Sequence, residues 1–224
     1  MGDVWPLVVL VPLGYLLGSI PFGLLVGLAR GVDVRTAGSG NIGASNVGRL
    51  LGGRFFALVC CLDVLKGLLP VLAGSFVVGR DPAWWVFLLW LLSGFAAVLG
   101  HMFSLFLGFH GGKGVATGAG LMLGLFPYYT YPAVAAIGVF VLLVLATRYI
   151  SVASIGAAVS FPMAYAAIGV WQRWELLGRQ WPLLVFAVVI AVLIVWKHRG
   201  NIARLRAGTE FRVGHARPKP SATT

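Results

Sequence analysis

The chain has 224 residues, of which 59% are hydrophobic and only 10% are charged. This composition excludes an ordinary soluble globular domain. In a soluble protein, the net charge of +11 would suggest binding to nucleic acid. Here the basic residues lie between long apolar runs and in the C-terminal tail, so the positive-inside rule explains them and no nucleic-acid partner is expected.

The cysteines predict neither redox nor metal chemistry. Cys60 and Cys61 are adjacent inside an apolar run, where they cannot form a structural disulfide, and no zinc-type spacing exists. The sequence therefore predicts an all-α integral membrane protein that needs no metal and no cofactor.

The first apolar run, from Val4 to Leu28, is interpreted as a retained helix. It is too long for the core of a signal peptide, about 7–15 residues, and Asp3 stands where a basic segment is expected. The run 114–147 exceeds the roughly 20 residues of one span and contains Pro127 and Pro132. It is either one kinked helix or two short spans.

The charge distribution favours two spans there, giving seven transmembrane helices with the N-terminus outside and the C-terminus cytoplasmic. Thirteen of the 17 Lys and Arg residues then face the cytoplasm and three face outward, whereas six spans give seven inside and nine outside. The thirteen are Arg30, Arg35, Arg49, Arg54, Lys113, Arg148, Lys197, Arg199, Arg204, Arg206, Arg212, Arg217 and Lys219.

The predicted organisation is a single membrane domain over 1–213 followed by a basic, disordered tail over 214–224. The unusual polar clusters all fall in the connections that this topology places in the cytoplasm, which predicts a one-sided site for a phosphorylated substrate. The predicted spans are 5–29, 53–79, 84–108, 114–126, 128–147, 151–171 and 181–197.

The first cluster covers residues 37–49. Gly38, Gly40 and Gly43 have the GxGxxG spacing, but a membrane helix precedes them instead of a β-strand, so a dinucleotide fold is excluded. Glycines still let backbone N–H groups converge on an anion, and Arg49 can bind a phosphate through two hydrogen bonds. The alternative is a flexible turn. Neutral donors in the cluster are Ser39, Asn41, Ser45 and Asn46.

The second cluster covers residues 108–117 and is not a Walker A motif, because Gly114 follows Lys113 where Ser or Thr is required. A lysine between Gly112 and Gly114 at a helix start suits phosphate, since a helix N-terminus presents free N–H groups and partial positive charge. The alternative is a lysine that only sets topology.

Within the second span, Asp63 and Lys66 are three residues apart and share a helix face. Charges inside the bilayer are costly, so we expect the two to neutralise each other, either as a structural pair or while shaping the site. His101 is expected to be a satisfied core histidine.

The third cluster begins where the last span ends. His198 and Asn201 are three apart and face the same way if the helix continues, and charge alone does not demand these residue types. Other basic residues of the tail are interpreted as contacts to anionic lipid headgroups. These residues are Arg206, Arg212, Arg217 and Lys219.

Together these motifs resemble the bacterial acyl-phosphate:glycerol-3-phosphate acyltransferase family (PlsY). The resemblance is carried, in order along nearly the whole chain, by GSGNIGASNVGR at 38–49, DVLKG at 63–67, GH at 100–101, GFHGGKGVAT at 108–117 and HRGNIARLRAGTE at 198–210.

The resemblance implies seven helices in the bacterial inner membrane and acyl transfer from acyl phosphate to the 1-hydroxyl of sn-glycerol 3-phosphate, giving lysophosphatidic acid and phosphate. It also implies functional coupling to the enzyme that produces acyl phosphate. Ser151 corresponds to a further substrate contact, with Ser154 as its rival, and Ser45 stands where Thr is common. By motif position the catalytic residues are Ser39, Arg49, Lys113, His198 and Asn201, and the substrate-binding residues are Gly38, Gly40, Asn41, Ser45, Asn46, Gly112, Gly114 and Ser151.

The residues fit direct transfer. No histidine is followed five positions on by Asp, and no Ser-His-Asp set stands out. Acyl phosphate is already activated, so we expect direct attack by the glycerol hydroxyl, with either His198 or a substrate phosphate oxygen taking the proton; the resemblance favours the phosphate. A transporter or flippase for organic anions is the rival class, and acylation from acyl-CoA is a third possibility.

Overall fold

The computed structural model describes residues 4–79 and 82–214. Within them it contains helices and no strand, which confirms the all-α prediction. The tail predicted from 214 onward lies, beyond Gly214, outside the described residues. The helices are α1 (Trp5–Ser19), α2 (Phe22–Leu28), α3 (Ala44–Leu51), α4 (Gly53–Ser75), α5 (Trp84–Met102), the short 3-10 helix η1 (Leu105–Leu107), α6 (Val115–Gly124), α7 (Thr130–Thr147), α8 (Ile150–Trp171), α9 (Trp181–Lys197) and α10 (Arg199–Arg206).

Five segments are long and apolar enough to cross a membrane: α1 with α2, α4, α5 with η1, α7 and α8. The pair α9 and α10, bent by 51°, makes a sixth if it counts as one span. Helix α6 has only 10 residues, which span about 15 Å of a hydrocarbon core about 30 Å thick. The chain is therefore a multi-pass integral membrane protein.

The first predicted span is interrupted between α1 and α2, where Pro21 follows Ile20. Proline lacks an N–H and pushes the residue before it away from the helical conformation. The Nζ atom of Lys66 donates to the Ile20 carbonyl oxygen over 3.0 Å. The same ammonium lies 2.9 Å from the Asp63 carboxylate, so the ion pair expected from the sequence is present and ties α4 to this break.

Glycines let α1 pack closely on α5. A Cβ atom at Gly14 would collide with the backbone oxygen of Ser93, and one at Gly18 with that of Ala97. Small residues at four-residue spacing allow such backbone contact in membranes, so these glycines serve packing, as their spacing indicates.

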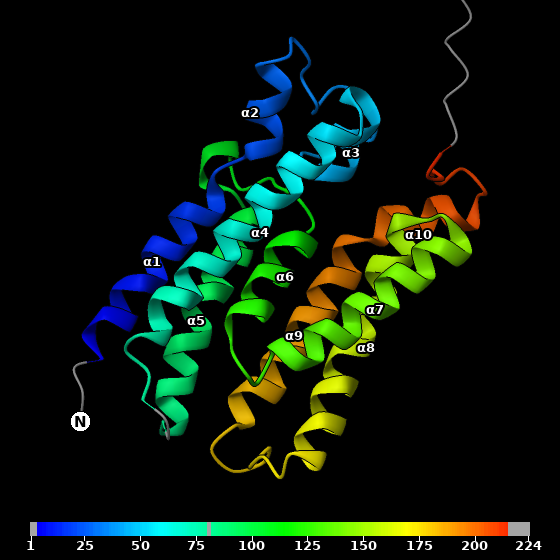
Figure 1. Ribbon diagram of the computed structural model, residues 1–224. Helices are drawn as coiled ribbons and strands as arrows, with labels where there is room; N and C mark the ends of the chain where they lie inside the picture. The colour runs from blue at the N-terminus through cyan, green and yellow to red at the C-terminus, as the bar shows by residue number, and fades with distance from the viewer. Residues whose placement is uncertain (1–3, 80–81, 215–224) are drawn as a thin grey trace, which may run out of the picture.

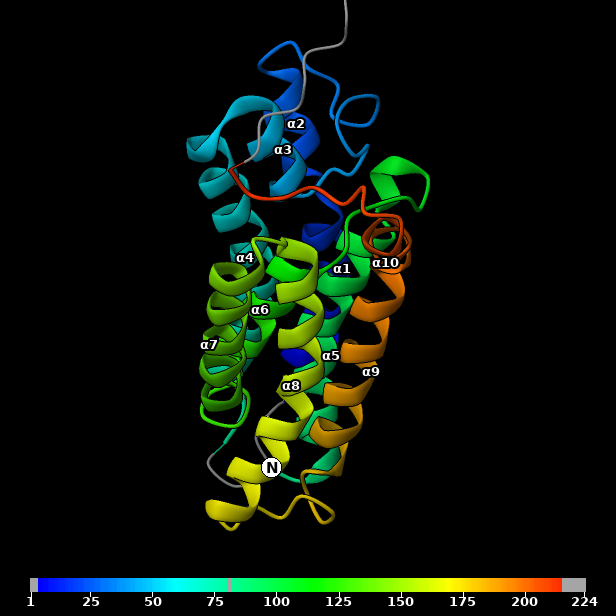
Figure 2. The ribbon, with the colours of Figure 1, turned by 90° about the vertical axis from the view of Figure 1, so that its right-hand side faces the viewer.

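The helices form one bundle in which α1 packs along α5, α4 along α6, and α8 against both α7 and α9. Figures 1 and 2 place α3, α10 and the connection between α5 and α6 at one end, here called the polar end. The α8–α9 connection lies at the opposite, distal end. Three polar clusters that are far apart in sequence therefore meet at one end.

The first polar loop has its own small core. Val34, Ile42 and Val47 are buried with Phe55 in a cluster separate from the main one. Burial of such side chains contributes roughly 1.5–3 kcal/mol each. This apolar base fixes the loop between α2 and α3 on the end of α4, which determines where its polar residues lie.

Candidate active site

The loop before α3 is held by Asn46, whose side chain is 1% exposed. Its amide oxygen accepts from the Ser39 N–H at 2.8 Å and from Arg49 at 3.3 Å. Its amide nitrogen donates to the carbonyl oxygens of Val34 and Ala37. These bonds use both donors and both lone pairs of the amide. Asn46 therefore organises the loop, and its predicted contact with substrate stays a prediction.

Gly38 and Gly40 both have positive φ angles, of 64° and 71°, and a Cβ atom at Gly38 would collide with the Asn46 amide oxygen. The Asn41 side chain accepts from the Gly43 N–H at 2.8 Å. These contacts curl the loop and leave Ser39 exposed at its outer side. Ser45, half-buried, lies in the first turn of α3.

The second loop folds back over His101. The Gly112 N–H donates to the His101 carbonyl oxygen over 2.9 Å, and a Cβ atom at Gly112 would collide with the His101 imidazole. Gly114, at φ 78°, precedes the first turn of α6. The imidazole is 5% exposed and its Nδ1 lies 3.6 Å from Asp63. His101 therefore lies beneath the second loop at Gly112 and joins that loop to the buried Asp63–Lys66 pair of α4.

The third cluster meets the second directly. The Lys113 ammonium donates to the Asn201 amide oxygen over 2.5 Å, across 88 positions of sequence. His198, 2% exposed, has its Nδ1 atom 2.7 Å from the Ile194 carbonyl oxygen. A carbonyl only accepts, so Nδ1 carries the hydrogen and Nε2 is the acceptor of the neutral ring.

Glu210 completes this cluster and was not predicted. Its carboxylate accepts from the Asn201 amide nitrogen at 2.6 Å and from Arg204 Nε at 2.7 Å. Burial raises the pKa of Glu210, but the hydrogen bonds from Asn201 and Arg204 outweigh burial and hold the pKa below its usual value. Glu210 is the only acidic residue from Lys197 to the C-terminus, which is the signal that sequence reasoning missed.

The pKa of Lys113 is lowered to about 8, first by burial and then by repulsion from Arg204 and Arg49, while Glu210 partly offsets the shift. Burial and the nearby arginines therefore make the charged form of the Lys113 ammonium less stable than it is in water. An anion bound beside the ammonium would compensate, by electrostatic attraction, for both the burial and the repulsion.

Ser151 lies toward Glu210 from the start of α8. Its hydroxyl is buried and, among the described residues, has no hydrogen-bond partner of good geometry. Its rival Ser154 donates instead to the Ile150 carbonyl oxygen over 2.8 Å. The structure thus brings Ser151, and not Ser154, toward Glu210 in this cluster.

The structure divides the predicted site residues into two groups. Lys113, His198, Asn201 and Ser151 gather around Glu210, and Arg49 approaches them across the mouth of the site. Ser39, Asn41 and Gly40 line the loop on the opposite wall. A hollow of about 200 Å³ lies between the first and second loops, lined by Arg35, Gly40, Ile42, Leu107, His110 and Gly111.

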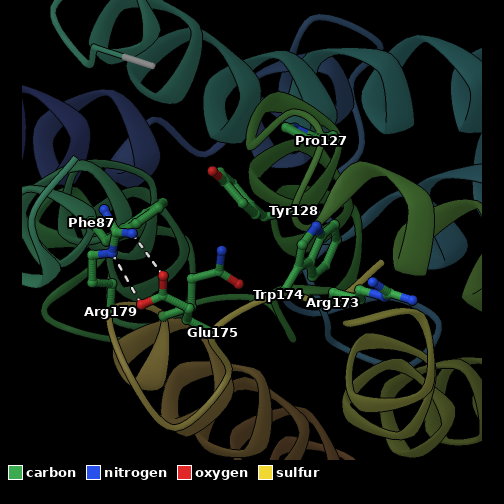
Figure 3. A pocket seen from close by; sticks show the side chains of 8 residues that line it. Phe87, Pro127, Tyr128, Arg173, Trp174, Glu175 and Arg179 are labelled. Carbon is green, nitrogen blue, oxygen red and sulfur yellow. Dashed lines mark hydrogen bonds and ion pairs between the residues drawn. The ribbon is translucent and has the colours of Figure 1, made fainter. Parts of the chain in front are cut away.

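A second hollow, of about 210 Å³, lies at the distal end. Figure 3 shows Tyr128 and Trp174 beside Glu175 and Arg179, whose side chains are joined as an ion pair at 2.7 Å. This hollow contains none of the predicted site residues. Glu175 and Arg179 neutralise each other there, and the remaining charged residue of its lining, Arg173, is exposed. The hollow is therefore not the candidate site.

Fold and site together define a multi-pass membrane protein with a cationic anion-binding cluster at one end. A family model described as glycerol-3-phosphate acyltransferase matches residues 8–208. The chain is 46% identical over 203 residues to the glycerol-3-phosphate acyltransferase of Geotalea daltonii, covering 91% of this chain and 95% of the relative. It is 50% identical over 199 residues to that of Geobacter metallireducens, covering 88% and 93%.

Two solved structures are also similar. Both are described as PlsY (YgiH), an integral membrane glycerol 3-phosphate acyltransferase. The glycerol 3-phosphate form has a TM-score of 0.80 and 40% identity, covering 93% of this chain and 96% of that one. The lysophosphatidic acid form has a TM-score of 0.77 and 39% identity, covering 93% and 95%. The chain belongs to the glycerol-3-phosphate acyltransferase family, as its motifs predict.

Proposed function

We propose that this protein transfers an acyl group from acyl phosphate to the 1-hydroxyl of sn-glycerol 3-phosphate, releasing lysophosphatidic acid and inorganic phosphate. Family membership supports glycerol 3-phosphate as the acceptor, and the similar structures are named for their glycerol 3-phosphate and lysophosphatidic acid forms. The single observation that carries the chemistry is the contact of Lys113 with Asn201, ringed by Arg49 and Arg204.

The donor is proposed from the chemistry of the site. Acyl phosphate brings its own good leaving group, so no enzyme nucleophile is needed, and Ser39 and Ser151 are not required to form an ester. The hydroxyl oxygen of glycerol 3-phosphate attacks the acyl carbon, the bond from that carbon to the phosphate oxygen breaks, and phosphate leaves. Lys113 and Arg49 neutralise phosphate charge, while Ser39 and Asn201 orient the reactants or stabilise the oxyanion.

The attacking hydroxyl proton is proposed to pass to a phosphate oxygen of the substrate. His198 is deeply buried and its Nδ1 is committed to Ile194, which leaves Nε2 to accept a hydrogen bond from the glycerol. In this role His198 aligns the hydroxyl without having to take up its proton. No cofactor is needed for a transfer between two oxygen atoms that involves no redox change.

The topology is proposed as seven spans with the N-terminus outside, the short helix α6 counting as a span, so that the polar end faces the cytoplasm of the bacterial inner membrane. The basic residues of the loops and tail support this orientation. A water-soluble acceptor then enters from the cytoplasm and the apolar donor from the bilayer. Functional coupling to the enzyme that supplies acyl phosphate is part of the same proposal.

The test gives purified protein glycerol 3-phosphate together with acyl phosphate, acyl-CoA or the acyl carrier protein thioester. We expect lysophosphatidate to form only when acyl phosphate is the donor, with one phosphate released for each lysophosphatidate formed. Product formed only from acyl-CoA would contradict acyl phosphate as the donor. The absence of product with every donor would contradict the proposal that the protein is this enzyme. The transporter alternative is not supported by the relatives, and counterflow of glycerol 3-phosphate in proteoliposomes without acylation is the result that would revive it.

A further inference from the structure

The segment 207–214, here called the C-terminal strap, crosses the mouth of the candidate site. Figure 2 shows it running from α10 toward α3 above the ends of the other helices. The strap is fixed at both ends: the Thr209 N–H donates to the Arg204 carbonyl oxygen and the Val213 N–H to that of Arg148, each over 2.8 Å. The ring it carries between these two anchors therefore has a defined position.

That ring belongs to Phe211. The Arg49 guanidinium carbon lies 3.9 Å from the ring centroid, and the Arg204 guanidinium carbon lies 6.0 Å from it. Both distances are within the range of cation–π attraction. Arg49 comes from α3 and Arg204 from α10, on opposite walls of the site. The ring thus contacts two cations that repel each other, and it links the walls.

The contact suits a phosphate-binding arginine. Stacking uses the face of the guanidinium, whereas a phosphate is bound through the N–H groups at its edge. The two interactions therefore do not compete. Arg49 is an exposed residue, and its hydrogen bond to Asn46 is long at 3.3 Å. An exposed arginine loses much rotamer freedom when it binds, and stacking on Phe211 removes part of that freedom beforehand.

We propose that Phe211 is a positioning residue that holds the Arg49 guanidinium ready for substrate phosphate. The inference rests on the proposed function, because it takes Arg49 to bind phosphate. Phe211 touches no reacting atom, so its removal is expected to weaken substrate binding while leaving the chemical step nearly intact.

The test compares Phe211→Leu, which keeps apolar bulk, with Phe211→Trp, which keeps an aromatic face. Phe76→Leu is the matched control, since Phe76 is 90% exposed beyond the end of α4. KM is measured for each phosphate substrate, and Arg49→Lys identifies the one that Arg49 binds. Phe211→Leu is expected to raise that same KM by about two- to tenfold with kcat within about twofold. Phe211→Trp and the control stay at the wild-type value.

Coupling between the two residues gives the second readout. In the Arg49→Lys background, Phe211→Leu is expected to add less than its effect in the wild type, because lysine cannot offer the same planar stack. An unchanged KM in Phe211→Leu, or a full effect in the Arg49→Lys background, overturns the inference. Thermal unfolding of each purified variant separates a change in substrate binding from misfolding of the variant.

The two proposals fail in different ways. Failure of the wild-type protein to form lysophosphatidate from any acyl donor contradicts the proposed function itself. Near-normal turnover of Arg49→Ala at saturating substrates contradicts the assignment of Arg49. An inactive Arg49→Ala beside a wild-type Phe211→Leu contradicts only the positioning role.

Discussion

The two ends of the bundle both carry arginines, a glutamate and aromatic rings, yet they differ in how their charges are balanced. At the distal end Glu175 and Arg179 form a pair of exposed side chains, and the one further charge that lines the hollow beside them, on Arg173, is exposed to solvent. At the polar end the Glu210 carboxylate forms an ion pair with Arg204, while two further cations, Lys113 and Arg49, lie nearby. Unbalanced, partly buried positive charge therefore marks the site better than concavity does.

The largest effect that sharpens this contrast is expected from Lys113→Ala. Removing a preorganised charged donor from an oxyanion or phosphate site typically costs about 10²–10³ in turnover. We expect a loss of that size in kcat for lysophosphatidate formation, measured on purified protein of normal melting temperature. Turnover near the wild-type value would place the chemistry somewhere else.

A smaller loss is expected from Glu210→Ala, about 10- to 100-fold in kcat/KM, because it leaves the Asn201 amide and the Arg204 guanidinium without their shared acceptor. A lowered melting temperature should accompany it. Glu210→Gln keeps an acceptor oxygen and should fall between wild type and Ala. Equal impairment of the two variants would mean that the negative charge of Glu210 carries the effect and that a neutral acceptor oxygen does not replace it.

The pH profile tests the unbalanced charge itself. Lys113 is charged below its pKa of about 8 and loses its charge as pH rises through that value. We therefore expect kcat/KM for the phosphate substrate to fall about tenfold per pH unit above pH 8. Bound anion favours the charged ammonium, so kcat should fall only at higher pH. Lys113→Arg, which stays charged, should show no such fall; a flat wild-type profile from pH 7 to 9.5 would contradict the assignment.

The smallest effect is expected at the distal end. Glu175→Gln and Arg179→Ala break a pair of exposed side chains, and such pairs contribute little to stability. Activity and melting temperature should match the wild type within error. A loss of activity comparable to that of Glu210→Ala would show that the distal hollow takes part in function.

The sequence predicted the fold class and the three polar clusters because hydropathy and glycine-rich motifs are local signals. Asp63 and Lys66 were predicted to pair from their spacing alone, and they do. The break at Pro21 separates two helices that hydropathy joins into one span, since a window average does not register a single missing N–H.

The site was harder to predict because its contacts join distant segments. Lys113 and Asn201 were both singled out, but their bond across 88 positions follows from the packing of α9 against α5, not from any local pattern. Asn46 is predicted to bind substrate because its side-chain type suits a ligand, and only the path of the loop shows that its amide also organises that loop. Phe211 carries no sequence signal of stacking on Arg49.

The central claim is that substrate phosphate binds at the polar end, and calorimetric titration of glycerol 3-phosphate into purified protein tests it most directly. Wild type and Arg179→Ala are predicted to bind with equal affinity, and Lys113→Ala is predicted to show no saturable heat over the same range. Wild-type affinity in Lys113→Ala, or lost binding in Arg179→Ala, would contradict the account.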